Sequence, residues 1–300
     1  MRTLAIAALL LTAGSSVALG QGRMIAIDSA RVVYEIDRTT GAKTQIGTAS
    51  AGATTGGLAY DAASQTLYLS STSLDSLFTL NLDTFEATLV GAYGDTSVVM
   101  HGLEWNSGNN TLYGGSAGSI YTISTTDGTA TLLNNTAIPS FSNLVYDSTN
   151  NAMYMTSSST DAFYSLDADL GTTNFIGFLA GPTNPNGLAY VPEDDAIYLV
   201  CNNTDTLYTI DRTTGVATAV GSTGSGNLLG LVWIPDGNGG NQCPRCPADY
   251  DQDGGVTGGD LAAFFADFEA GETCADVDQD GGVTGGDIGT FFQFFEAGGC

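Results

Sequence analysis

The sequence between residues 24 and 234 repeats one pattern five times, at an interval of 41 to 45 residues. Each repeat holds four short segments of alternating apolar and polar residues, bounded by turn residues and without helical periodicity. Four strands in a unit of this length are typical of a β-propeller blade. The repeats therefore predict an all-β, five-bladed β-propeller over residues 21–234. A repeat-built sandwich or solenoid is the alternative. The repeats begin at Met24, Thr66, Thr111, Ala152 and Ala196.

The last strand of a repeat carries a glycine, a leucine and, two places on, an aromatic residue, and we expect it to be the innermost strand. Four copies stand at residues 57–60, 102–105, 187–190 and 230–233. The array starts one strand after this motif, so the first blade lacks its inner strand until residues 230–234 arrive. Such a closure removes open sheet edges, which template aggregation.

The tail contains two nearly identical twelve-residue segments, 249–260 and 276–287. Each has carboxylates at its first, third, fifth and last positions and a glycine at its sixth, which is the ligand order of a calcium loop. We therefore predict two Ca²⁺ sites. Two acidic, solvated loops without an ion are the alternative. The predicted ligands are Asp249, Asp251, Asp253, Gly255, Thr257 and Asp260 in the first loop, and Asp276, Asp278, Asp280, Gly282, Thr284 and Asp287 in the second.

A helix is expected after each loop, because Thr257 and Asp260, like Thr284 and Asp287, have the spacing of a capping pair. No helix is expected to enter the first loop, since Pro244 and Pro247 precede it. Apolar residues then follow at helical spacing, and we expect them to form a shared core. They are Leu261, Phe264, Phe265 and Phe268, and Ile288, Phe291, Phe292 and Phe295.

Roughly the last 55 residues resemble a dockerin domain, which consists of two calcium loop-helix units without entering helices. The resemblance implies a small α-helical domain over residues 243–300 that binds a cohesin-like or other cell-surface anchoring protein. The positions that select the cohesin in that family are glycines in this chain, at 258–259 and 285–286. The ending 298–300, Gly-Gly-Cys, is similar to that of bacterial GC-type dockerin-anchored proteins. The blades are similar to secreted bacterial propeller repeats.

Residues 1–20 have the composition of a secretory signal peptide. Arg2 precedes an apolar run at 4–11, and small residues end the segment. A membrane anchor is the alternative, but the run is too short to span a bilayer. We expect a secreted, extracellular or cell-surface protein without a transmembrane segment in its mature chain. Residues 235–242 are expected to be a flexible linker. The net charge of −25 argues against nucleic-acid binding.

Cysteine usage fits an oxidising compartment, because four of the five cysteines cluster in the small tail. Four cysteines permit three pairings. We favour a disulfide between Cys300 and either Cys246 or Cys243. Cys201 falls in an apolar strand and is expected to be a buried thiol.

His101, the only histidine, is the one candidate general base, and it precedes an inner strand near the expected axis. Aspartates recur at equivalent turns of several blades, where a turn role explains them better than catalysis. They are Asp75, Asp161 and Asp205 at one turn and Asp37, Asp83, Asp167 and Asp211 at the other. The loops expected on one face are rich in Ser, Thr, Asn and Gly, which suits a polar ligand or glycan as well as ordinary surface loops. These loops are residues 50–56, 92–101, 134–142, 180–186 and 222–229.

The function favoured by these patterns is a non-catalytic binding or scaffold propeller, anchored outside the cell by the calcium-dependent tail. The alternative is a polysaccharide-active enzyme, a hydrolase or lyase, because dockerins often carry such enzymes. The scarcity of His, Lys and Arg speaks against that alternative. A structural surface-layer component is a third possibility.

Overall fold

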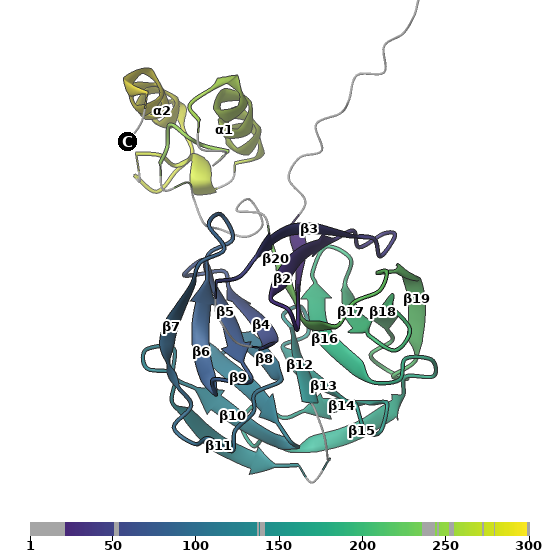
Figure 1. Cartoon of the computed structure of the whole chain (residues 1–300). Helices are drawn as coiled ribbons and strands as arrows, with labels where there is room; N and C mark the ends of the chain where they lie inside the picture. The colour runs from purple at the N-terminus through teal and green to yellow at the C-terminus, as the bar shows by residue number, and fades with distance from the viewer. Residues whose placement is uncertain are drawn as a thin grey trace, which may run out of the picture.

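The computed structural model describes residues 22–50, 54–136, 138, 142–235, 244, 246–251, 255–271, 273–278 and 280–298. Five four-stranded antiparallel sheets surround a common axis, and two helices follow them in the chain (Figure 1). The predicted five-bladed β-propeller and helical tail are thereby confirmed. The predicted signal peptide and residues 236–242 of the predicted linker lie outside the described residues.

Each blade is one sheet, and its strands follow one another from the axis outward. Blade 1 is β20 (Leu228–Ile234), β1 (Arg23–Asp28), β2 (Val32–Ile36) and β3 (Lys43–Thr48); blade 2 is β4 (Thr55–Asp61), β5 (Thr66–Ser71), β6 (Ser76–Leu80) and β7 (Ala87–Ala92); blade 3 is β8 (Gly102–Asn106), β9 (Thr111–Ser116), β10 (Ser119–Ile123) and β11 (Ala130–Asn135); blade 4 is β12 (Ser142–Asp147), β13 (Ala152–Ser157), β14 (Ala162–Leu166) and β15 (Thr173–Phe178); blade 5 is β16 (Pro185–Val191), β17 (Ala196–Cys201), β18 (Thr206–Ile210) and β19 (Ala217–Ser222).

Blade 1 is built from both ends of the array, as the position of the motif predicts. Strand β20 pairs antiparallel with β1, placing Trp233 opposite Met24 and Leu231 opposite Ala26. The first blade therefore receives its inner strand from the far end of the repeats, and the ring of sheets is closed by backbone hydrogen bonds.

The inner strands approach one another so closely that the glycine of the motif has a steric cause. A Cβ added at Gly57 would lie 2.5 Å from the backbone nitrogen of Leu103 in the next blade, and one at Gly230 would lie 2.8 Å from the carbonyl oxygen of Gly56. One leucine per inner strand is buried beside these glycines. The axis is thus packed with side chains at this level.

Two arginines tie neighbouring blades together at turns of the outer hairpins. Arg212 of blade 5 forms an ion pair of 3.0 Å with Asp147 of blade 4, whose side chain is fully buried. Arg38 of blade 1 forms a 3.2 Å ion pair with Asp194 of blade 5 and lies over the ring of Trp233. Arg38 therefore bridges blades 5 and 1, beside the pair of strands that closes the ring.

The recurring aspartates have turn roles. Asp75, Asp161 and Asp205 adopt positive φ angles of 46° to 48°, which aspartate tolerates better than most residues. At the other turn the Oδ1 atoms of the aspartates in blades 1, 4 and 5 accept backbone N–H groups two residues ahead. In blade 2 the acceptor is Oδ1 of Asn81, and Asp83 donates its backbone N–H group to it. The expected turn role of the Asp83 side chain is therefore wrong, because Asn81, two residues earlier, has that role.

The tail forms helices α1 (Gly258–Ala270) and α2 (Gly285–Ala297), with a short 3₁₀ helix η1 (Thr273–Ala275) between them. The rings of Phe264 and Phe291 stack with centroids 4.1 Å apart and planes 3° from parallel. The other apolar residues predicted from the helical spacing pack around this pair. The stripes therefore form the core of the tail, as expected. No helix among the described residues is long and apolar enough to cross a membrane.

Replacement of Gly57 by alanine tests the steric origin of the motif. The new methyl group would collide with the backbone of Leu103, so we expect a loss of roughly 1–3 kcal/mol in the free energy of unfolding, as for other overpacked sites. Urea unfolding measures it. Gly181→Ala is the matched control, because its nearest neighbour would be a Tyr208 ring atom at 4.0 Å. Equal stability of the two variants would contradict the steric explanation.

Candidate functional site

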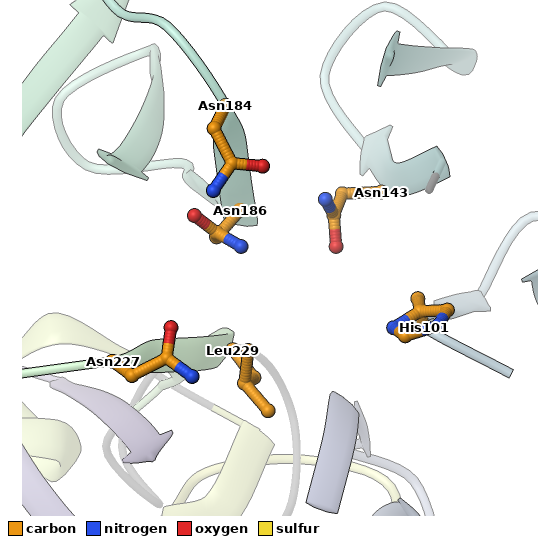
Figure 2. Close-up of a pocket in the computed structure, with 6 residues that line it drawn as sticks. All are labelled: His101, Asn143, Asn184, Asn186, Asn227 and Leu229. Atoms are coloured by element: carbon orange, nitrogen blue, oxygen red, sulfur yellow. The ribbon is translucent and has the colours of Figure 1, made fainter. Parts of the chain in front are cut away.

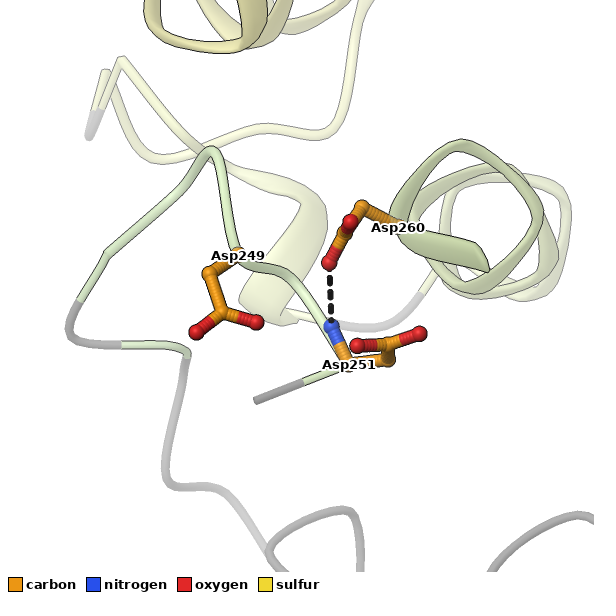
Figure 3. Close-up of side chains that lie close together, drawn as sticks. All are labelled: Asp249, Asp251 and Asp260. Carbon is orange, nitrogen blue, oxygen red and sulfur yellow. Dashed lines mark hydrogen bonds between the residues drawn. The ribbon is translucent and has the colours of Figure 1, made fainter. Parts of the chain in front are cut away.

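The first acidic loop brings three predicted ligands together. Asp249, Asp251 and Asp260 each offer a carboxylate oxygen, and these oxygens lie within 4.8 Å of one another (Figure 3). The backbone N–H group of Asp251 donates to Oδ1 of Asp260 over 3.1 Å, which draws the loop against the start of α1. Asp253 lies outside the described residues.

The second loop repeats this arrangement with Asp276, Asp278 and Asp287. The N–H group of Asp278 donates to Oδ1 of Asp287, again over 3.1 Å. Asp280 is not part of this cluster, and its Oδ1 accepts the N–H group of Gly282 over 3.1 Å. Three carboxylates per loop are thus shown to be close together, whereas roles for Asp280 and for the carbonyl groups of Gly255 and Gly282 stay predictions.

The last aspartate of each loop is held by the helix cap. The N–H group of Thr257 donates to Oδ2 of Asp260 over 2.6 Å, and the Thr257 hydroxyl accepts the N–H group of Gly259 over 3.0 Å. Thr284 and Asp287 form the same reciprocal capping box at α2. The expected capping pairs are confirmed. The hydroxyl oxygens of both threonines satisfy helix N–H groups, and their coordination of an ion stays a prediction.

The pKa values of these carboxyl groups are shifted in opposite directions by their surroundings. Burial raises the pKa of Asp260, but hydrogen bonds from the N–H groups of Thr257 and Asp251 outweigh burial, and the pKa lies below its ordinary value. Loss of hydration raises the pKa of Asp278, and the neighbouring carboxylates raise it further. Asp287 resembles Asp260, because burial raises its pKa but backbone hydrogen bonds outweigh burial and lower it. The carboxylates around Asp278 repel one another, and a bound cation would offset that repulsion.

One glycine of each pair that precedes the last aspartate has a structural cause. A Cβ at Gly259 would lie 2.5 Å from Oδ2 of Asp251, and one at Gly286 would lie 2.8 Å from Oδ2 of Asp278. Gly258 and Gly285 have open space where a Cβ would be. The second glycine of each pair thus lets a predicted ligand approach the first turn of the helix.

These clusters fit a hard divalent cation. Their donors are carboxylate oxygens from alternate residues of a turn and from a helix start, and cations such as Ca²⁺ and Mg²⁺ prefer oxygen ligands. Both loops can therefore hold a metal ion in equivalent positions.

Tyr250 is a structural residue that the loop pattern does not reveal. It occupies the second position of the first loop and is 1% exposed. Its hydroxyl donates to Oδ2 of Asp267 over 2.9 Å, and its ring meets Phe264 and Phe291 edge-on. The second loop has Val277 at this position. The sequence signal that could have identified Tyr250 as a core residue is its aromatic side chain within a largely polar loop.

The propeller has a pocket of about 180 Å³ at one mouth of its axis (Figure 2). His101 lies there, as its place before an inner strand predicts. Two further polar loops expected on this face, residues 180–186 and 222–229, supply its other residues except Asn143, which belongs to β12. The lining residues are His101, Asn143, Asn184, Asn186, Asn227 and Leu229.

Burial lowers the pKa of His101 to about 4, so the imidazole is neutral at neutral pH. Glu104 on β8, in the same blade, is also perturbed, since burial raises its pKa well above the ordinary value. Glu104 is not among the residues lining the pocket. The pocket itself therefore presents amide groups and one neutral imidazole.

The cysteine predictions have separate outcomes. Cys201 is a buried thiol, as expected, and its sulfur donates to the carbonyl oxygen of Thr183 over 3.0 Å. Cys243 and Cys300 lie outside the described residues, so the favoured pairing with Cys300 stays a prediction.

No protein-family model and no curated protein matches this chain. Among solved structures, it is similar to a chain of a nidogen/laminin complex, at 12% identity and a TM-score of 0.52, covering 72% of this chain and 98% of that one. An auxiliary nutrient binding protein from Bacteroides thetaiotaomicron VPI-5482 matches at 14% identity and a TM-score of 0.49, over 69% and 63% of the two chains. A virginiamycin B lyase from Staphylococcus aureus matches at 16% identity and a TM-score of 0.43, over 66% and 69%. At its identity the first match supports the propeller fold alone.

The single histidine allows a direct test of the pocket's protonation state. We expect the His101 side-chain resonances to titrate in NMR with a midpoint near pH 4, because burial disfavours the imidazolium ion. The same chain unfolded in urea should titrate near the ordinary value of about 6.5. A midpoint above pH 6 in the folded protein would show that this imidazole is well hydrated.

Proposed function

We propose that residues 243–300 are a calcium-dependent, dockerin-like anchoring module with two Ca²⁺ ions, and that the propeller of residues 21–234 is a non-catalytic binding or scaffold domain displayed outside the cell. The observation that carries this proposal is the duplication of the acidic cluster. Each cluster stands at the start of a capped helix and has the same hydrogen bonds around its last aspartate.

Calcium is the cation that this ligand set fits best. It takes six to eight oxygen ligands in flexible geometry, whereas Mg²⁺ demands a near-ideal octahedron and keeps several waters. Each loop offers carboxylates at four positions, together with a carbonyl and a hydroxyl group. In this assignment Asp249, Asp251 and Asp260 bind the first ion, and Asp276, Asp278 and Asp287 bind the second. Asp253, Asp280, the carbonyls of Gly255 and Gly282, and Thr257 and Thr284 complete the two sets.

Metal binding also explains how so small a module is stable. Among the described residues of the tail, four form the buried centre of the apolar cluster: Tyr250, Phe264, Ala275 and Phe291. Crowded carboxylates oppose folding unless a cation neutralises them, and the free energy of binding then becomes folding free energy. We therefore infer that calcium orders the loops and fixes the angle between α1 and α2.

The proposed partner of the tail is a cohesin-like or other anchoring protein on the cell surface. Gly258 and Gly285 leave open space at the start of both helices, so backbone and neighbouring side chains would form the contact. The signal-like residues 1–20 support export. A binding role for the propeller is favoured over polysaccharide cleavage because the axial pocket is lined by amides and one imidazole. Glycoside hydrolysis ordinarily uses two carboxyl groups across the scissile bond.

Replacing Asp249 and Asp253 together by alanine should remove one of two Ca²⁺ ions, because two ligands and their charge leave the same loop. Isothermal titration calorimetry on the full chain measures the stoichiometry, which we expect to fall from two to one. Asp83→Ala removes an exposed carboxylate from the propeller and is the control. Two ions bound by the double variant would refute the assignment of this loop.

Anchoring is tested by capture from the surface fraction of the producing cell, with the full chain as bait. We expect a surface protein to be retained in calcium and released by chelator, and the Asp249/Asp253 variant to retain less of it. Capture that persists in chelator, with no metal bound, would contradict calcium-dependent anchoring.

A further inference from the structure

The axial pocket is a blind cup rather than a pore. Below its mouth the inner strands contribute a layer of leucines that leaves no space for a water molecule. These residues are Leu58, Leu103, Leu144, Leu188 and Leu231. A ligand can therefore enter only from the mouth. The leucine layer limits how deeply a ligand can enter. The polar groups around the mouth therefore decide which ligands bind.

Asn143, which lines the cup, distinguishes the inner strand of blade 4 from those of the other blades. It occupies the place at which the other inner strands carry Gly57, Gly102, Gly187 and Gly230. It is 5% exposed, and its Nδ2 donates to the carbonyl oxygen of Pro185 in blade 5 over 3.3 Å. In blade 4 this position thus carries, in place of the glycine, a buried carboxamide that bridges two blades beside the pocket.

Hydrogen bonds outside the cup set the direction of several carboxamides. Asn202 donates through Nδ2 to Oδ1 of Asn227 over 2.6 Å, and through its backbone N–H group to Oδ1 of Asn186 over 3.4 Å. These contacts leave the Nδ2 groups of Asn227 and Asn186 as donors. The bond to Pro185 leaves Oδ1 of Asn143 as an acceptor. Figure 2 shows the carboxamides and the imidazole arranged around one open space.

The cup carries no formal charge at neutral pH. None of its lining residues is acidic, and its single titratable group, His101, has a pKa lowered by burial to about 4. The chain as a whole has a net charge of −25, which repels anions at long range. Neutral ligands are therefore favoured over phosphates and carboxylates.

The size of the cup narrows the choice further. A volume of about 180 Å³ corresponds to roughly six water molecules at the density of the liquid. That space suits one sugar ring and is small for an oligosaccharide. Hydroxyl groups both donate and accept, matching the mixed donors and acceptors of the amides. Leu229 adds an apolar surface against which the C–H groups of a ring can pack.

We propose that this cup binds one neutral hexopyranose unit of a glycan, with Asn143, Asn186, Asn227 and His101 as its hydrogen-bonding residues. The proposal rests on the binding role proposed above and names the ligand class of that role. Asn202 is a positioning residue, since it acts through Asn186 and Asn227. Because the recognition uses no ion, glycan binding by the cup is independent of the calcium that the tail requires.

The test is saturation-transfer NMR on the full-length protein with methyl glucopyranoside, methyl galactopyranoside and methyl mannopyranoside, each titrated to ~20 mM, since binding of a single ring is weak. We expect saturable binding of at least one of them. Asn143→Gly and Asn227→Ala should each weaken it by about tenfold, which is the loss of one well-placed hydrogen bond. The glucuronide corresponding to a bound glucoside should bind more weakly, because its carboxylate meets no cation.

Three controls separate the possible causes of a loss of binding. Asn174→Ala changes an exposed asparagine on the outer strand β15 and should bind like the wild type. Thermal unfolding shows whether each variant folds. If Asn143→Gly fails to fold, the binding of Asn227→Ala decides the test, because that substitution only removes a side chain from a surface loop. Repeating the glycoside titration in chelator distinguishes binding by the cup from the calcium-dependent function of the tail. Retained glycoside binding with lost anchoring supports both proposals, whereas retained binding with calcium-independent anchoring overturns only the tail.

Three results would overturn the cup proposal. The first is no saturable binding of any of these glycosides by the wild type. The second is binding that neither Asn143→Gly nor Asn227→Ala weakens. The third is binding that disappears in chelator, because the ligand would then be held by a metal ion.

Discussion

The close approach of five inner strands around one axis is the constraint on which the propeller depends. Backbones can meet at this distance only where a side chain is missing, and this explains the glycine of each motif at Gly57, Gly187 and Gly230. The leucine that follows then fills the axis. Where blade 4 departs from the rule, Asn143 bridges to the neighbouring blade and leaves a polar recess. The stability of the ring and the polar recess at its axis thus arise from the same strands.

The tail follows a different principle, since its apolar core is too small to specify its loops. Phe264 and Phe291 hold the helices together by direct stacking, while the acidic segments are oriented by hydrogen bonds to backbone N–H groups at the helix starts. Asp260 and Asp287 have two roles: each accepts a hydrogen bond in the cap of its helix, and each belongs to a carboxylate cluster. Any ion bound there would act directly on the first turn of each helix.

The architecture could be predicted from the sequence because both parts are repeats. Spacing alone identified the blades, the strand that closes the ring, the capping pairs and the apolar stripes of the helices. Asx turns were harder to place, and Asn81 rather than Asp83 takes that role because asparagine accepts the same hydrogen bonds. The pocket could be located only in part. His101 and the loops of the mouth were expected there, but the partners of Asn143 and Asn202 lie in other strands and loops, and tertiary contacts of this kind leave no local pattern.

The closure of blade 1 has a mechanical consequence. The tail follows β20 in the chain, so any tension applied to the tail would enter the ring at Ile234, which is paired with Arg23 at the start of β1. The stretch that bears the load is hydrogen-bonded on one side and packed against the axis on the other. A force on the tail would therefore have to detach the innermost strand of the first sheet before any outer strand is strained. The pairing of β20 with β1 that closes the ring is thus also the pairing that would bear such a force.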